Sequence, residues 1–400
     1  MREGWEYKKL GDVCTIERGG SPRPIADYIT ESADGINWIK IGDAVEGSKY
    51  ILFTKEKIRP EGIKKSRFVH KGDVILSNSM SFGKPYVLGI DGCIHDGWLV
   101  LHDNNNTFSK DYLYYVLSSP IMYSKFTQLA VGGVVNNLNS NIVREVVVAV
   151  PPLSTQLSIV FELDRINELI RLKKEQLKDY DNLAQSIFYE MFGDPVVNEK
   201  GWEVKKLGEL SDLICNGNTP KGGSEVYVDT GFLFLRSQNV WKNRIELDDV
   251  AFIDEATHKS LKKSSLKHND LLITKTGRIN TENSSLGRTA LFEGEDNSAN
   301  INGHVYLVRL KDGMVHKFVL YILISNSYRE LIRKTCVGGI DKRQLNKDHI
   351  EDFPIIFPPI ELQKKYVERI ELIEKQKEQV RSTIQDLETL LASRMQYWFD

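Results

Sequence analysis

The sequence contains few cysteines and no long apolar run. Its four cysteines lie far apart and include no Cys-x-x-Cys pair, so we expect free thiols in a reducing compartment and neither a disulfide framework nor a thiolate metal site. No stretch approaches 18 uninterrupted apolar residues, which argues against a membrane-spanning helix. The first residues also lack the apolar core of a secretory signal. These absences predict a cytoplasmic protein without membrane contact.

Motifs for the common catalytic chemistries are missing as well. The chain has no Gly-x-Gly turn, and its two Pro-Pro pairs follow Val150 and Phe357 instead of Asn or Asp. The cofactor motif and the target-amine motif of an adenine methyltransferase are therefore absent. The only Gly-Lys pair, Gly83-Lys84, precedes Pro85 and does not match a Walker phosphate loop. The eight histidines show no metal-ligand spacing. We expect no catalytic residue, no metal and no cofactor.

A metal-dependent nuclease is an alternative, since such enzymes often combine an Asp with [Asp/Glu]-x-Lys. The second half of this motif occurs twice, in Glu6-Tyr7-Lys8 and Glu203-Val204-Lys205. An acidic residue precedes only the second copy, at Asp194. We interpret both tripeptides as solvated faces of opening strands.

What the chain does contain is an internal duplication. Residues 4–11, Gly-Trp-Glu-Tyr-Lys-Lys-Leu-Gly, return at 201–208 as Gly-Trp-Glu-Val-Lys-Lys-Leu-Gly. The shared segments predict a common frame, and the different segments between them predict loops that serve different targets. The other matched segments, in order, are 19–23 with 217–221, 72–77 with 269–274, 111–117 with 317–323, 131–134 with 337–340, and 151–156 with 358–363.

Two kinds of segment alternate along the chain. Residues 1–151 and 195–358 combine short β-rich runs, short helices and polar loops. Residues 152–194 and 359–400 contain long helices, at 153–192 and 360–399, without internal Gly or Pro. The predicted fold is α+β, with two similar globular α/β domains separated by two long helices.

The two helical segments carry apolar residues in steps of four and three, a pattern typical of a coiled coil. Lys173, Lys377 and Arg394 interrupt this pattern. Each helix would be about 60 Å long, whereas residues 193–201 can span at most ~30 Å, so the second domain should begin near the far end of the first helix. The second helix would then run back along the first. This predicts an antiparallel coiled-coil pair with a pseudo-two-fold axis.

The repeated order of segments resembles the specificity subunits of type I restriction-modification systems. The likeness covers the whole chain and rests on Gly-Trp-x-x-Lys-Lys-Leu-Gly, a [Ser/Thr]-Pro turn, Gly-Gly, Pro-Pro-[Leu/Ile]-x-x-Gln and a long helix, each present twice. It implies target-recognition domains at 1–151 and 195–358. It also implies conserved helices at 152–194 and 359–400 that set the spacer of a bipartite DNA target.

The same resemblance implies the partners of the chain. They are double-stranded DNA, two methyltransferase subunits and the restriction subunits, with adenine methylated in each half of the target and no catalytic activity of this chain alone. Two alternatives stay open: a coiled-coil scaffold that does not bind DNA, and a solitary nuclease or methyltransferase. Because the net charge is -2, any DNA-binding face must be a local patch.

Candidate DNA contacts lie in loops between the repeated strands. Bases are read by amides and by Arg or Lys, and phosphates are held by Lys, Arg and hydroxyl groups. The strongest clusters are residues 274–278 and 341–344, while Phe82 either stacks beside a flipped base or packs in the core. The predicted DNA-binding residues are Arg23, Asn78, Ser79, Ser81, Lys84, Asn136, Asn137, Asn139, Lys221, Arg236, Gln238, Asn239, Lys275, Arg278, Asn280, Arg288, Lys342, Arg343 and Gln344.

Overall fold

The computed structural model describes residues 2–45, 47–78, 82–103, 105–130, 138–279, 281, 283–339 and 342–400. The chain divides into two compact units, one formed by Met1–Glu175 with Val380–Asp400 and the other by Gln176–Gln379. Each long helix contributes one part to each unit. The finer division into recognition domains and helices stays a prediction.

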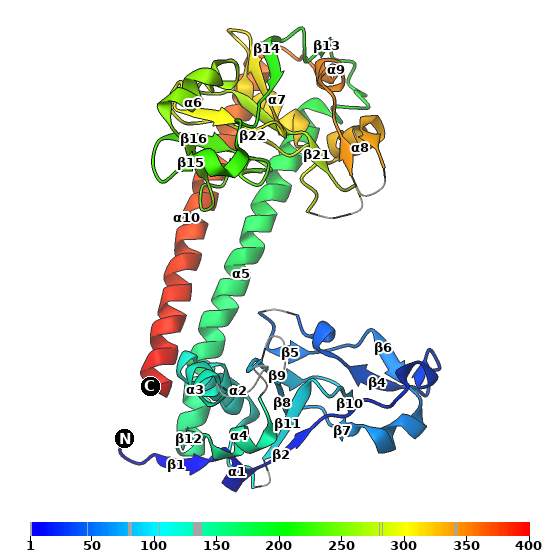
Figure 1. Ribbon diagram of the computed structural model, residues 1–400, viewed down its shortest axis with the longest axis vertical. Helices are drawn as coiled ribbons and strands as arrows, with labels where there is room; N and C mark the ends of the chain where they lie inside the picture. Colours follow the sequence, from blue (N-terminus) through cyan, green and yellow to red (C-terminus); the bar gives the residue numbers. More distant parts are fainter. Residues whose placement is uncertain are drawn as a thin grey trace. The chain divides into compact units, whose positions relative to one another are not determined.

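The first unit is built on two sheets, a terminal strand pair and short helices (Figure 1). One sheet has the order β2 (Cys14–Arg18), β11 (Trp98–Asp103), β8 (Val74–Ser77), β9 (Pro85–Leu88) and β5 (Tyr50–Ile51). The other has the order β3 (Ile29–Thr30), β6 (Glu56–Ile58), β4 (Ile36–Ile39), β10 (Gly92–Ile94) and β7 (Arg67–Val69). The remaining elements are β1 (Glu6–Lys9) paired with β12 (Val147–Val150), α1 (Leu10–Val13), α2 (Lys110–Ser118), α3 (Pro120–Ala130) and α4 (Ser140–Glu145).

The second unit repeats this plan and adds two small sheets. One larger sheet has the order β14 (Ser211–Asn216), β24 (Val305–Leu310), β20 (Leu271–Thr274) and β22 (Thr289–Leu291). The other has the order β15 (Tyr227–Val228), β19 (Ala251–Ile253), β16 (Phe232–Leu235) and β23 (Ala299–Ile301). The small sheets are β17 (Val240–Trp241) with β18 (Arg244–Ile245), and β21 (Thr276–Gly277), β26 (Arg343–Gln344), β25 (Val337–Gly338). The other elements are β13 (Val204–Lys206) with β27 (Pro354–Ile356), α6 (Glu255–Ser260), α7 (His316–Leu323), α8 (Asn326–Thr335) and α9 (Lys347–Glu351).

The duplication in sequence is therefore a duplication of topology. The order β2-β11-β8-β9 of the first unit matches β14-β24-β20-β22 of the second. Each unit also contains one parallel pair in its other large sheet, β4 with β10 and β16 with β23. The prediction of a mixed α/β frame present twice is confirmed.

A repeated turn shows why the two copies agree in sequence. Gly72 and Asn269 have φ angles of +88° and +68°, a backbone region that glycine enters freely and asparagine more readily than other residues. The next residue is Asp73 in one copy and Asp270 in the other. Each carboxylate accepts a hydrogen bond from the backbone N–H three residues earlier, at 2.8 and 2.7 Å. The same turn thus leads into β8 and β20.

The long helices have the predicted bounds. They are α5 (Leu153–Phe192) and α10 (Ile360–Phe399), of 40 residues each. A buried glutamine fastens the first turn of each helix to the preceding Pro-Pro pair. Gln156 Nε2 donates to the carbonyl of Pro151 at 3.0 Å, and Gln363 Nε2 donates to the carbonyl of Pro358 at 2.8 Å. The repeated glutamine therefore fixes the direction in which each helix leaves its unit.

Within each unit the two helices are antiparallel. In the first unit Glu162 accepts a hydrogen bond from Arg394 at 3.1 Å, and Lys174 pairs with Glu388 at 2.8 Å, so residue numbers rise along α5 as they fall along α10 (Figure 1). In the second unit Asp181 pairs with Lys377 at 2.8 Å, and the rings of Phe192 and Tyr366 are 5.5 Å apart. The predicted antiparallel pairing is confirmed.

Two of the charged interruptions lie where the helices meet. The side chain of Lys377 is 8% exposed, and its ammonium lies 2.8 Å from Asp181 and 3.0 Å from Glu374. Arg394 binds Glu162 and lies over the ring of Trp398 at 5.3 Å. Because a buried charge requires a partner, these pairs favour one register of the two helices.

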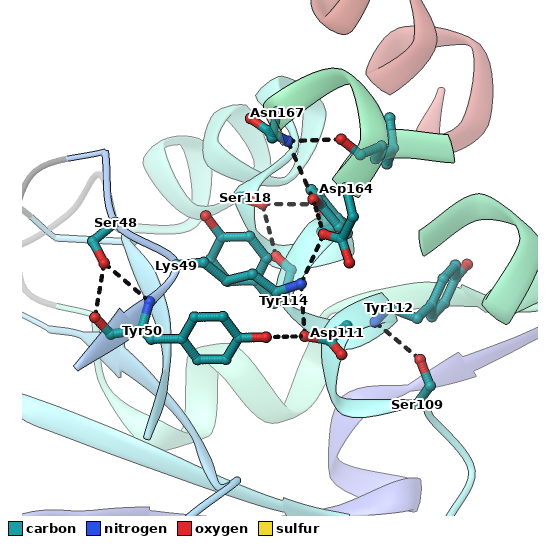
Figure 2. Close-up of polar contacts among 12 residues, drawn as sticks. Ser48, Lys49, Tyr50, Ser109, Asp111, Tyr112, Tyr114, Ser118, Asp164 and Asn167 are labelled. Atoms are coloured by element: carbon teal, nitrogen blue, oxygen red, sulfur yellow. Dashed lines mark hydrogen bonds and ion pairs between the residues drawn. The ribbon is translucent and has the colours of Figure 1, made fainter. Parts of the chain in front are cut away.

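In the first unit a lysine joins a divergent loop to the repeated frame (Figure 2). Lys49 Nζ lies 2.6 Å from Asp111 of α2 and 3.0 Å from Asp164 of α5, and Tyr115 also donates to Asp164. Burial by itself would lower the pKa of Lys49, but hydrogen bonds to the two carboxylates raise it above its ordinary value. The lysine therefore stays charged and fastens its loop to both helices.

In the second unit the corresponding loop is joined to the frame by an amide, and the frame contains an ion pair of its own. Asn243, between β17 and β18, donates from its amide to Tyr321 at 3.4 Å and to Glu374 at 3.3 Å. Lys317 of α7 pairs with Glu371 of α10 at 2.9 Å. Here the frame supplies its own cation, and the loop contributes an amide.

Candidate nucleic-acid interface

The two strongest predicted clusters meet in one small sheet of the second unit. Residues 276–277 form β21, residues 343–344 form β26, and the two strands pair in antiparallel register, Thr276 with Gln344 and Gly277 with Arg343. Strand β25 from the Gly-Gly loop pairs with the other edge of β26. Segments almost 70 residues apart in sequence thus form one surface.

This small sheet is packed closely against the loop that follows β21. A Cβ atom at Gly277 would lie 2.4 Å from the backbone nitrogen of Leu286, so only glycine fits there. Ser285 donates from its hydroxyl to the carbonyl of Thr276 at 2.7 Å, and Thr274 donates to the carbonyl of Ser285. Hydrogen bonds from these two hydroxyl groups therefore hold the part of the loop around Ser285 against the small sheet.

An open hollow of about 470 Å³ lies beside the small sheet. Arg278 and Lys342 are exposed at this hollow, and Arg288 forms part of its wall. The described residues around it include no Asp or Glu. A surface with three cations, hydroxyls and an amide matches the groups that proteins use on DNA phosphates and base edges. The described lining residues are Thr276, Gly277, Arg278, Thr281, Asn283, Ser284, Ser285, Arg288 and Lys342.

Both units place a cation at the same turn. Lys84 precedes β9, and Arg288 precedes β22, which is the matching strand. In each case the carbonyl of the cationic residue accepts a hydrogen bond from the end of the preceding strand, at 3.0 Å from Ser77 and 2.9 Å from Thr274. The residue before each cation is a glycine with positive φ, +79° at Gly83 and +69° at Gly287. A Gly-[Lys/Arg] turn before a strand is thus part of the repeat.

Arg288 is held in a fixed position. Its guanidinium lies 3.7 Å above the ring of Trp241 and donates to the carbonyls of Ser284 at 3.0 Å and Asn283 at 2.5 Å. Burial lowers the pKa of Arg288, and the nearby Arg244 lowers it further. The group keeps its charge, since arginine is not deprotonated in proteins, and it presents this charge in a defined orientation.

Several predicted contacts serve the loops themselves. Arg343 donates to the carbonyl of Cys336 at 3.2 Å, and its Nε is buried without a hydrogen-bond partner among the described residues. Asn239 is 2% exposed and holds the β17–β18 hairpin through the carbonyls of Glu246 and Asp249. These two side chains are directed inward.

The other predicted residues of the second unit lie at or near its surface. Gln238 is exposed and donates to Asp249 at 2.7 Å, and Arg236 pairs with the same carboxylate at 3.2 Å. Lys275 lies 5.8 Å from the ring of Tyr306. Lys221 and Gln344 are exposed.

In the first unit fewer of the predicted residues fall in the described part. Arg23 is exposed and lies 3.8 Å from Asp96, whereas Asn78 is buried and donates to the carbonyl of Asp96 at 3.0 Å. Asn139 caps α4 by accepting a hydrogen bond from Ile142 at 3.0 Å. Lys84 is exposed, and Phe82 packs in the core beside Tyr123. Predicted residues that lie outside the described residues are Ser79, Ser81, Asn136, Asn137 and Asn280.

Trp241 is a residue that the sequence reasoning missed. It lies in the segment 240–267, where the two copies differ, and only the fold brings it beneath Arg288. The available signal was the run Trp241-Lys242-Asn243-Arg244, which alternates aromatic, basic and amide side chains. Aromatic side chains beside Lys and Arg are used by proteins that bind single-stranded nucleic acid.

Two other kinds of site were searched for in the described part of the chain. No group of three or more His, Cys, Asp or Glu side chains there could hold a metal ion. None of the described helices combines the length and apolarity needed to cross a membrane.

A mixed α/β frame that occurs twice, with different loops on each copy and a long helix after each, defines a protein with two duplicated globular units. Its family follows from comparison. Residues 2–179 and 199–389 match the type I restriction modification DNA specificity domain, and the chain belongs to this family.

Known proteins of similar sequence are specificity subunits of type I restriction enzymes. The chain is 23% identical over 385 residues to the MjaIX specificity subunit of Methanocaldococcus jannaschii. The matched region covers 90% of this chain and 85% of that protein. The chain is 20% identical over 397 residues to the StySPI specificity subunit of Salmonella potsdam, covering 93% and 82%.

Solved structures share the fold. A chain from a study of complex assembly and conformational transition of the type I R-M system matches with a TM-score of 0.61 at 20% identity, covering 99% of this chain and 97% of that one. The S subunit of a type I system from M. genitalium matches with a TM-score of 0.52 at 14% identity, covering 99% and 96%.

Proposed function

We propose that this chain recognises a bipartite DNA target and directs adenine methylation and restriction by partner subunits. Each globular unit reads one half of the target through its own loops, and the long helices set the separation of the halves. The chain contributes recognition, and the chemistry resides on methyltransferase and restriction subunits. Its four free and buried thiols fit a protein that acts on DNA in the reducing cytoplasm.

One observation carries this proposal. Residues 274–278 and 342–344 converge through β21 and β26 beside a hollow whose described lining has three cations and no carboxylate. The matching turn of the first unit carries Lys84 where the second carries Arg288. A frame that keeps a cation in place while its loops change fits readers of two different sequences on a uniform phosphate backbone.

The rival function is a scaffold whose globular units do not touch DNA. The test is methylation mapping of the host genome with and without this gene, together with DNA binding by the chain assembled with its methyltransferase subunits. We expect a two-part methylated motif that disappears with the gene. Normal assembly without any sequence-selective binding would favour the scaffold.

The helix α5 offers a surface for a protein partner. Leu153, Leu157, Phe161 and Leu169 lie along it and are each between 47% and 63% exposed. The matching positions of α10 after the first are Lys364, Glu368 and Gln376. Exposed apolar residues on α5 that are replaced by charged or polar residues at three matching positions of α10 fit a protein-protein contact, and we assign it to a methyltransferase subunit. Phe161→Asp should weaken assembly with that subunit, whereas Glu368→Lys at the matching position should not.

The role of the helices as a ruler has a separate test. An insertion of one helical turn after Leu177, matched by one in α10, should change the preferred separation of the half-sites and leave their sequences unchanged. Methylation mapping measures both quantities. An unchanged spacer in an insertion variant that assembles normally would rule out this role.

A further inference from the structure

A second hollow adjoins the candidate interface of the second unit. It has a volume of about 390 Å³ and lies between the β17–β18 hairpin, the loop before β22, and the helices α7 and α8. It shares Asn283, Ser284 and Arg288 with the first hollow. The shared residues make the two hollows neighbours along one surface, and Arg288 lines both of them.

The described lining of this second hollow is strongly basic. Lys242, Arg244, Arg288 and Arg329 contribute four cations, and no Asp or Glu belongs to the described lining. None of these cations except Arg288 was among the residues predicted to bind DNA. A concave surface with a single sign of charge concentrates its field and attracts ligands of the opposite sign.

Trp241 holds two of these cations in place. Its ring lies 3.7 Å from the guanidinium of Arg288 and 5.2 Å from that of Arg244, and its indole N–H donates to the carbonyl of Gln238 at 2.9 Å. Arg244 pairs with the carboxylate of Glu246 at 2.7 Å. The stacking brings two like charges close together and orders them before any ligand arrives.

The side chain of Lys242 is exposed to solvent, although its surroundings disfavour its charge. Burial lowers the pKa of Lys242, and Arg329 and Lys377 lower it further against the opposing attraction of Asp181. The Lys49 ammonium of the first unit is the reverse case, because two carboxylates hold it charged. An anion in the hollow would give Lys242 the partner that the described protein lacks at this point.

We infer that backbone phosphates of the bound DNA occupy this second hollow, where Lys242, Arg244 and Arg288 hold them without reading sequence. The inference rests on the proposed function, which it extends from the candidate base-reading sheet to a phosphate site around Trp241. Continuity through Arg288 favours DNA over an acidic protein surface, because this residue lines both hollows. The three cations contact phosphate oxygens and fix the orientation of the duplex.

The test uses the chain assembled with its methyltransferase subunits and measures DNA affinity as a function of salt. Lys242→Gln and Arg288→Gln should each reduce the slope of log K against log salt by about 0.9, the value for one lost phosphate contact. The loss should be equal on target and non-target duplexes. Lys242→Arg should restore the slope. Lys259→Gln removes a charge from an exposed lysine of α6 outside both hollows and should leave the slope unchanged.

The outcomes separate this inference from the proposed function. If the unmodified complex binds its target selectively and the Lys242 and Arg288 variants keep the full salt slope, the phosphate site is wrong while the proposed function stands. A loss of affinity for the target alone would make these residues base readers and overturn the inference. Weaker assembly with an unchanged slope would assign the hollow to a protein partner. If the unmodified complex shows no selective binding, the proposed function itself fails.

Discussion

The junctions between loop and frame differ between the two units although the frame is the same. Tyr115 and Tyr321 occupy matching positions, and each hydrogen-bonds an acidic residue of the long helix beside it. In the first unit the frame presents Asp111 and the loop supplies Lys49 as the cation. In the second the frame presents Lys317, which pairs with Glu371, and the loop supplies an amide.

This difference shows that frame and loop are matched in charge within each unit. A loop with a buried lysine needs two carboxylates in the frame, and a loop with an amide does not. We therefore expect that loops cannot be exchanged between the units without exchange of the frame charge as well. The following predictions test this comparison.

The largest effect should come from the glutamines that fasten the helices. Gln156 accepts from the backbone of Ser109 and donates to the carbonyls of Thr107 and Pro151, whereas Gln363 donates to Pro358. Gln156→Ala leaves more buried backbone groups without a partner than Gln363→Ala does. It should therefore lower the free energy of unfolding by about 3 kcal/mol, and Gln363→Ala should lower it by about 1 kcal/mol. Urea unfolding of the whole chain measures both. Equal losses in the free energy of unfolding would mean that the two glutamines stabilise the fold to the same extent.

The next effect concerns the junction of the first unit. Lys49→Met leaves Asp111 and Asp164 close together without their cation and should lower the free energy of unfolding by about 2 kcal/mol, less than for a fully buried pair because both carboxylates are partly exposed. Adding Asp111→Lys copies the second unit and should recover most of this loss. Thermal unfolding tests both variants. If the double variant is no more stable than Lys49→Met, the idea of matched charges is wrong.

A third prediction separates an outward arginine from an inward one. Arg278→Ala should reduce target binding by about 1–3 kcal/mol if it contacts a base, with little effect on folding. Arg343→Ala should first destabilise the small sheet, because its guanidinium bonds the carbonyl of Cys336. DNA binding and thermal unfolding of the assembled complex distinguish the two. Unchanged target binding of the Arg278 variant would remove this residue from the interface.

The smallest effect concerns pH. Asp73 lies 3.5 Å from His102 in the first unit, and Asp270 makes the matching pair with Arg309 at 2.6 Å in the second. The hydrogen bond to Asp73 raises the pKa of His102 above 6.5. This pair therefore stabilises the first unit fully below pH 6.5, and the contribution, about 1 kcal/mol or less, is lost as the pH rises through the raised pKa.

A matched substitution tests this assignment. His102→Arg copies the second unit and should remove that part of the pH dependence, because arginine keeps its charge throughout the range. Thermal unfolding between pH 5.5 and pH 8.5 measures the difference. If the variant loses as much thermal stability with rising pH as the natural chain does, another group is responsible for this loss.

The order of the repeated motifs along the sequence was enough to predict much of the fold. Both long helices, their bounds and their antiparallel pairing follow from the apolar period, the Pro-Pro starts and the short link between the copies, because these features act locally along the chain. The repeat matched Asp73 with Asp270 for the same reason. The repeat also placed the candidate interface in the loops that follow β8 and β20.

Tertiary structure alone decided which of the candidate side chains face solvent. Asn78 and Asn239 look like ideal base readers in sequence but are buried, because the Asn78 amide donates to the carbonyl of Asp96 in the β10–β11 loop and the Asn239 amide donates to carbonyls of its own hairpin. Trp241 gained its place only when the β17–β18 hairpin packed beside the turn of Arg288. Contacts between segments that are distant in sequence decide where a loop side chain points and which groups it binds. No local sequence pattern contains this information.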